Sequence, residues 1–167
     1  VFQGPSPHTM RRLSLILALA LCTSAVRATA QSGREQVLAS VNSFFDAMRA
    51  RDTTAMMQHV DTLTRFTLLR PNPNGGSRVM VLRPADFARA VTNPNQPPLD
   101  ERMRNPLVQV DGDLATVWAE YQVRRDGNVT HCGYDAFHLA RLDGKWKIIN
   151  ISDTFRRTGC GDAWPVK

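Results

Sequence analysis

Three titratable residues that could carry proton chemistry lie in the C-terminal half of the chain: Glu120, His131 and Asp135. A carboxyl group among apolar side chains has a raised pKa, which prepares it to exchange protons near neutral pH. The sequence contains no glycine-rich phosphate loop, and no second Cys or His stands at metal-ligand spacing from Cys132 or Cys160. The sequence therefore predicts no metal and no cofactor, and cofactor-free acid–base chemistry is the reaction type that these residues could perform.

The strands that must position these residues are predicted by alternating apolar and polar side chains. Three pairs interrupt the alternation: Asp111-Gly112, Asp126-Gly127 and Asp143-Gly144. Glycine accepts the positive φ of tight hairpin turns, so each pair predicts a turn between antiparallel neighbours. The result is a meander of four strands over 107–110, 114–123, 129–142 and 145–155.

The N-terminal half is predicted to be mainly helical. Apolar residues recur at steps of three and four from Arg34 to Arg51, which indicates an amphipathic helix. Asp52 is suited to cap a short second helix, and Pro84 to begin a third that ends at Val91. Two strands, over 63–69 and 78–82, are expected between the second and third helices, and a proline-rich loop over 92–98 after them.

Two-residue turns in the last two hairpins would place Trp118 directly opposite Asp135, with His131 on the same sheet face and Glu120 diagonal to it. Aromatic side chains near the turns and polar ones farther along predict an apolar pocket with a few convergent polar groups. We expect Asp135 and His131 to be the catalytic candidates, although hydrogen-bonded structural roles remain open for both. The expected ligand contacts, for a small apolar or aromatic molecule, are Trp118, Glu120, Phe137, Trp146, Asn150 and Ser152.

The opposite face of the predicted sheet is also largely apolar and should be covered. It is expected to carry Tyr121, Tyr134, His138 and Ile149. A second copy of the chain or a larger exported assembly is the expected cover, and a homodimer through this face is the expected oligomer.

The first 30 residues have the pattern of a secretory signal. Arg11 and Arg12 precede an apolar run over 13–21, and Ala28-Thr29-Ala30 fits a cleavage site after Ala30. The run is too short to span a membrane, which needs about 20 apolar residues. We expect residues 10–30 to be a signal peptide, residues 1–9 a tag remnant or upstream extension, and the mature chain periplasmic or secreted.

Removing the signal leaves one domain over 31–158 and a C-terminal tail over 159–167. Only Cys132 and Cys160 remain, and an even pair in an exported chain predicts a disulfide, with two separate buried thiols as the alternative. The formal charge of +6 falls to +3 because the first 30 residues hold three arginines and no acid. That balance is too mild to indicate a nucleic-acid partner.

The order helix, helix, strand, strand, helix and meander resembles the nuclear-transport-factor-like superfamily, which includes SnoaL-like polyketide cyclases and lumazine-binding proteins. Its most specific segments are 110–117 and 143–148, with His131-Cys132-Gly133 and Asp153-Thr154 similar to exported bacterial members. The resemblance implies an α+β cone, in which three N-terminal helices pack on a strongly curved, mainly antiparallel mixed sheet. Gly133-Tyr134-Asp135 also resembles the cyclases' Gly-x-Asp, whose aspartate is a catalytic acid/base.

Three functions are compatible with these observations, because one fold can host many. The first is an exported domain that binds a small molecule in one apolar pocket. The second is a cofactor-free cyclase, isomerase or dehydratase that uses Asp135 as acid/base. The third is an interaction subunit of an exported assembly, docking through the outer sheet face.

Overall fold

The structure is a computed structural model that describes residues 32–165. The expected signal peptide, its cleavage site after Ala30 and residues 1–9 lie outside the described residues. Within 32–165, no helix is long and apolar enough to cross a membrane.

Three helices pack on one face of the sheet, as the family resemblance implies. The first covers 32–50 and buries Val37, Val41 and Phe44. In α2 (Thr53–Gln58) the predicted cap is present, because the Asp52 carboxylate accepts a hydrogen bond from Ala55 N at 2.9 Å. The third, α3 (Pro84–Val91), begins at the predicted proline, whose missing N–H needs no partner in the first turn.

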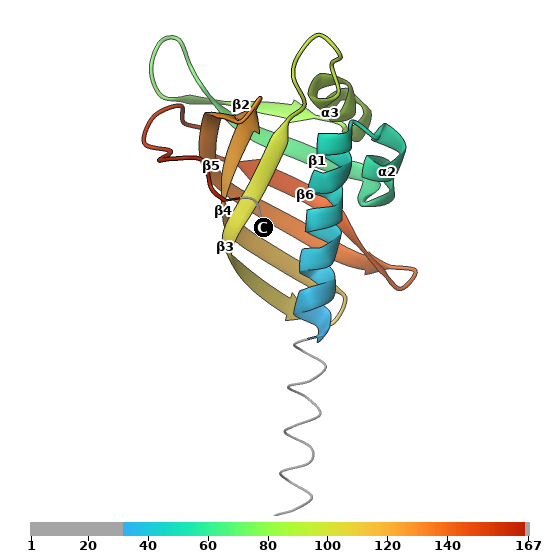
Figure 1. Ribbon diagram of the computed structural model, residues 1–167. Helices are drawn as coiled ribbons and strands as arrows, with labels where there is room; N and C mark the ends of the chain where they lie inside the picture. Colours follow the sequence, from blue (N-terminus) through green and yellow to red (C-terminus); the bar gives the residue numbers. More distant parts are fainter. Residues whose placement is uncertain (1–31, 166–167) are drawn as a thin grey trace, which may run out of the picture.

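Six strands form one mixed sheet in the order β2-β1-β6-β5-β4-β3. All neighbours are antiparallel except β1 and β6, which are parallel. The helix over 32–50 lies along the concave side of the curved sheet, with α2 and α3 near one of its ends (Figure 1). This is the predicted α+β cone. The strands are β1 (Val60–Pro71), β2 (Ser77–Leu82), β3 (Asp100–Asp111), β4 (Leu114–Arg125), β5 (Asn128–Leu142) and β6 (Lys145–Asp153).

A single hydrophobic core joins the helices to the inner face of the sheet, the face toward the helix over 32–50. Phe44 and Phe45 of that helix contact Phe66 of β1 and Phe137 of β5, with ring centroids 6.2 and 5.8 Å apart. Such contacts between rigid aromatic side chains fix the helix over the sheet and determine which strand positions face inward.

Two β-bulges change the register that tight turns alone would give. Near the turn at Asp126-Gly127 the pairing is as predicted, but it shifts by one residue between Val123 and Arg124. The β5–β6 pairing shifts in the same way between His138 and Leu139. A shift of one residue moves side chains to the other face of the strand pair. The prediction that Trp118 opposes Asp135 is therefore wrong: Trp118 pairs with Ala136, and Asp135 with Ala119.

The C-terminal tail is attached to the outer face by a disulfide between Cys132 and Cys160, as predicted. Cys132 pairs with Arg156, not with Phe155 as the unbulged register predicts. The buried amide of Gln122 donates to the carbonyls of Cys160 and Asp162 at 3.2 and 3.0 Å and accepts from Trp164 N at 3.0 Å. The segment around Cys160 thus lies against β4.

Candidate functional site

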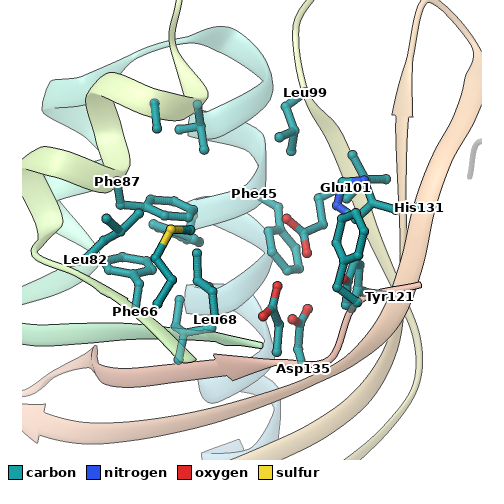
Figure 2. Close-up of a pocket in the computed structure, with 18 of the residues that line it drawn as sticks. Phe45, Phe66, Leu68, Leu82, Phe87, Leu99, Glu101, Tyr121, His131 and Asp135 are labelled. Carbon is teal, nitrogen blue, oxygen red and sulfur yellow. The ribbon is translucent and has the colours of Figure 1, made fainter. Parts of the chain in front are cut away.

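A cavity of about 250 Å³ lies between the helices and the inner face of the sheet. Its walls come from the helix over 32–50, from α3 and from all six strands. Figure 2 shows Phe66, Leu82 and Phe87 at one end, and Glu101, Tyr121, His131 and Asp135 at the other. The lining side chains are Phe44, Phe45, Phe66, Leu68, Arg70, Met80, Leu82, Phe87, Ala90, Val91, Leu99, Glu101, Tyr121, Val123, His131, Asp135, Phe137, Ile151, Asp153 and Phe155.

Stacked aromatic rings form the apolar end of the cavity. The rings of Phe66 and Phe87 are nearly parallel, with centroids 4.0 Å apart, and Phe44 lies 6.2 Å from each. The three residues come from β1, from α3 and from the helix over 32–50. This end can hold a hydrocarbon or aromatic group but offers it no hydrogen bond.

Asp135 of β5 and Glu101 of β3 meet at the polar end of the cavity. The Asp135 side chain is 2% exposed, and its Oδ2 has no hydrogen-bond partner among residues 32–165. Figure 2 shows the carboxyl of Glu101 directed toward that of Asp135, and each of the two groups affects the pKa of the other. A hydrogen bond between them forms only when one carries a proton, because an ionised carboxylate is an acceptor only.

Burial is the main cause of the raised pKa values of this pair. Desolvation raises the pKa of Asp135 well above its ordinary value, and the negative charges of Glu101 and Asp153 raise it further. The pKa of Glu101 is raised by burial and by the charge of Asp153. The pair therefore retains a proton at a pH where exposed carboxyls have lost theirs.

Arg70 of β1 and Asp153 of β6 form an ion pair beside the carboxyl pair, with Arg70 Nη1 2.7 Å from Asp153 Oδ1. Asp153 also accepts a hydrogen bond from Leu69 N at 3.1 Å. Burial nevertheless raises the pKa of Asp153. Arg70 Nη1 is thus engaged by Asp153, while Asp135 Oδ2 has no donor within the described residues.

Tyr121 and His131 complete the polar end in their neutral forms. The Tyr121 hydroxyl donates to the carbonyl of Thr154 at 2.7 Å, and burial and the nearby carboxyls raise its pKa. Burial, followed by the positive charges of Arg70, Arg125 and Arg157, lowers the pKa of His131 to about 4. His131 Nδ1 lies 3.0 Å from Thr130 Oγ1.

Gly133 is needed for the close packing behind Tyr121. A Cβ atom at Gly133 would lie 2.1 Å from the carbonyl oxygen of Thr154 and 2.7 Å from Cε1 of Tyr121. Packing therefore explains why the first residue of Gly133-Tyr134-Asp135 is glycine. The absence of a side chain there lets the Tyr121 ring lie against β5.

No protein-family model matches the sequence, and no curated protein sequence matches it either. Solved structures do match. A protein from Novosphingobium aromaticivorans, described as NTF2-like with a cystatin-like fold, is 14% identical with a TM-score of 0.65, over 84% of this chain and 92% of that one. This chain has the NTF2-like fold.

Other similar structures come from proteins with different descriptions. A candidate dehydratase of the NTF2-like family from Streptomyces avermitilis is 16% identical with a TM-score of 0.58, over 75% of this chain and 97% of that one. The association domain of C. elegans CaMKII is 18% identical with a TM-score of 0.57, over 75% of this chain and 97% of that one. At these identities the NTF2-like fold is shared, but the fold alone does not assign a function.

Of the residues that the sequence predicts for the site, Asp135, His131 and Phe137 line the cavity of this NTF2-like fold. Trp118, Glu120, Asn150 and Ser152 do not. The bulges place them on the outer face, where Trp118 stacks on Tyr134 at 5.1 Å and Glu120 pairs with Arg104. Trp146 is buried on the inner side but lies outside the cavity lining.

The reverse error concerns Tyr121, which is predicted on the outer face but lines the cavity. Glu101, Arg70 and Asp153 also line the cavity, although their sequence pattern does not predict them as site residues. Glu101 precedes the segment predicted as a strand, since β3 begins at Asp100 and not at residue 107. The signal that could identify Asp153 is its place in Asp153-Thr154, the pair quoted for the family resemblance.

Proposed function

We propose that this protein is an exported domain that binds one small, largely apolar molecule in the cavity between its helices and its sheet. The observation that carries the proposal is a cavity with phenylalanine walls at one end and, at the other, a buried carboxyl oxygen of Asp135 that has no partner within residues 32–165. Ligand sites typically combine apolar walls with a few convergent polar groups.

The size of the cavity supports a small ligand. About 250 Å³ lies just below the usual range for ligand pockets, which is about 300 to 1,000 Å³. A single-ring aromatic or a short branched aliphatic molecule fits that volume, whereas a nucleotide cofactor does not.

Export is supported by the disulfide between Cys132 and Cys160. Disulfides form and persist in oxidising compartments such as the periplasm, and are rare in the cytosol. The ligand would accordingly be a molecule present outside the cytoplasm.

Ligand binding can be tested with a fragment library and two matched variants. Val123→Phe adds a ring inside the cavity, whereas Val79→Phe adds it at a strand position that is 62% exposed. Fragments that shift the amide NMR signals of cavity residues should bind Val123→Phe at least about tenfold more weakly, and Val79→Phe as they bind the wild type. Equal binding to all three proteins, or no binding by any fragment, would contradict the proposal.

Proton transfer is a second candidate function, favoured by the raised pKa values of Asp135 and Glu101. Acid–base catalysts work best when their pKa lies near the working pH. The candidate dehydratase among the NTF2-like neighbours supports a reaction of this type.

This second function can be tested without its natural substrate. A carbon acid such as 2-tetralone exchanges its α-hydrogen for solvent deuterium when a base removes the proton. The wild-type protein in D₂O should accelerate that exchange, and Asp135→Asn should not. Glu120→Gln, on the outer face, is the control and should behave as the wild type. Equal exchange rates with Asp135→Asn and with the wild type would exclude Asp135 as the base.

A further inference from the structure

The polar end of the cavity contains more hydrogen-bond acceptors than donors. Three carboxyls line it, from Glu101, Asp135 and Asp153, and one guanidinium, from Arg70. Arg70 is engaged by Asp153, and the Tyr121 hydroxyl donates to a main-chain carbonyl. Within residues 32–165, the buried Oδ2 of Asp135 therefore has no donor.

We propose that the ligand is a protonated amine on a compact apolar body, with its ammonium group between the carboxyls of Asp135 and Glu101. This inference rests on the proposed binding function and names its ligand class. An ammonium group supplies three N–H donors and one positive charge. One of these donors would satisfy Asp135 Oδ2, which is buried and has no partner among the described residues.

The charges around the pair favour a cation over a neutral ligand. The pair faces Asp153 and Arg70, whose opposite charges offset each other in an ion pair. It also faces the neutral side chains of Tyr121 and His131. The part of the cavity wall formed by the helix over 32–50 and by α3 is apolar. Asp135 and Glu101 hold protons because a negative charge is costly to bury without a partner, and a bound cation would supply that partner and let a carboxylate form.

A neutral carbonyl ligand fits less well, because it brings an acceptor and no donor. A carbonyl could accept a hydrogen bond from a protonated carboxyl of the pair, but it would supply no donor to Asp135 Oδ2, which has none among the described residues. The walls at the other end favour an aromatic or branched aliphatic body, since Phe44, Phe66 and Phe87 line it.

The test compares two molecules of nearly equal shape, 2-phenylethylamine and 2-phenylethanol. Their affinities for the mature protein would be measured by isothermal titration calorimetry at pH 7 in two buffers of different ionisation enthalpy. The amine should bind at least about tenfold more tightly than the alcohol. Its binding should also release protons, because the cation drives the carboxyl pair to ionise.

Two variants make the test specific. Asp135→Asn keeps the shape of the side chain and removes its charge, so it should abolish both the preference for the amine and the proton release. Glu120→Gln removes a carboxyl of the outer face that pairs with Arg104, and should leave both unchanged.

The outcomes separate this inference from the proposed function. Equal or tighter binding of the alcohol would overturn the amine inference and leave a cavity that binds neutral molecules. An amine preference that persists in Asp135→Asn would also overturn it. Failure of both molecules to bind, together with the failure of the fragment library, would overturn both proposals.

Discussion

Glu101 and Asp135 share the polar end of the cavity although their strands are not neighbours, since β4 lies between β3 and β5. The inward curvature of the sheet brings the two side chains together across β4. A carboxyl pair formed in this way exists only in the folded protein, so its proton is linked to the free energy of unfolding.

The first prediction concerns stability against pH. Because folding raises the pKa values of Asp135 and Glu101, their stabilising contribution is full at acid pH and is lost as the pH rises toward the folded-state values. Between pH 6.5 and 8.5 the free energy of unfolding should fall with rising pH. The slope is up to about 1.4 kcal/mol per pH unit for each proton that the folded protein holds and the unfolded chain has lost. Urea denaturation across this range measures it.

Asp135→Asn should flatten this dependence and should be more stable than the wild type at pH 8.5. Glu120→Gln is the control, because Arg104 lowers the pKa of Glu120 and its contribution changes only in acid. His131 acts below the chosen range: its lowered pKa means that stability is lost as the pH falls from about 6.5 to about 4. A wild-type profile that stays flat from pH 6.5 to 8.5 would show that the pair is ionised.

The second prediction concerns the disulfide. Cys132 and Cys160 are 28 residues apart in sequence, and a loop of this length corresponds to about 3.5 kcal/mol of stabilisation in the chain-entropy model. The double variant Cys132→Ser/Cys160→Ser should therefore have a lower Tm. Denaturing alkylation of the unreduced mature protein should modify neither cysteine. Modification of both cysteines without reductant would refute the bridge.

The third prediction concerns the outer face. The strand registers align Leu107, Trp118 and Val81 in one row across it, and these side chains are 57%, 48% and 55% exposed. We expect a second copy of the chain to cover this row, because exposed apolar patches of this kind mark interaction sites. Analytical ultracentrifugation of the mature protein should show a dimer, and Trp118→Arg should make it monomeric.

A charge placed elsewhere controls for a general loss of solubility. Leu63 is 76% exposed and lies outside the row, so Leu63→Arg should leave the dimer intact. A wild-type protein that is monomeric at high micromolar concentration would contradict the prediction.

The fourth prediction compares two glycines. Gly133→Ala forces a Cβ against the main chain at Thr154, so it should destabilise the protein by more than about 2 kcal/mol, in the range of overpacked cores. Gly33→Ala meets only ordinary contact, with Val110 Cγ1 at 3.7 Å, and lies in the helix over 32–50. It should be neutral or stabilising by up to about 1 kcal/mol. Thermal denaturation of the two variants measures both effects, and equal Tm values would contradict the packing argument.

Local sequence signals predicted the elements of this fold well. Asp126-Gly127 and Asp143-Gly144 adopt positive φ at both turn positions, as the primed hairpin turns require. Asp52 caps α2, and Pro84 begins α3. Each of these turns and helix starts depends on the backbone preferences of one or two residues, and those preferences can be predicted from the residue types alone.

The site was predicted less well because it depends on relations between strands. A bulge such as the one at Val123/Arg124 requires no particular residue type, yet it determines whether Trp118 or Tyr121 faces the cavity. Glu101 was missed for another reason. The start of β3 consists mostly of charged residues, so it lacks the apolar alternation that predicts a strand. Its Asp100 instead forms ion pairs with Arg49, Arg102 and Arg124.

The proton retained by Asp135 and Glu101 makes the pair a natural spectroscopic label. A protonated carboxyl has a C=O stretching vibration separate from the bands of ionised carboxylates and of the amide backbone, and burial sharpens it. A molecule entering the cavity changes either the charge or the hydrogen bonding of this group, and so changes its infrared band. Difference spectra of the wild type and Asp135→Asn could therefore report cavity occupancy in unlabelled protein, even before the natural ligand is identified.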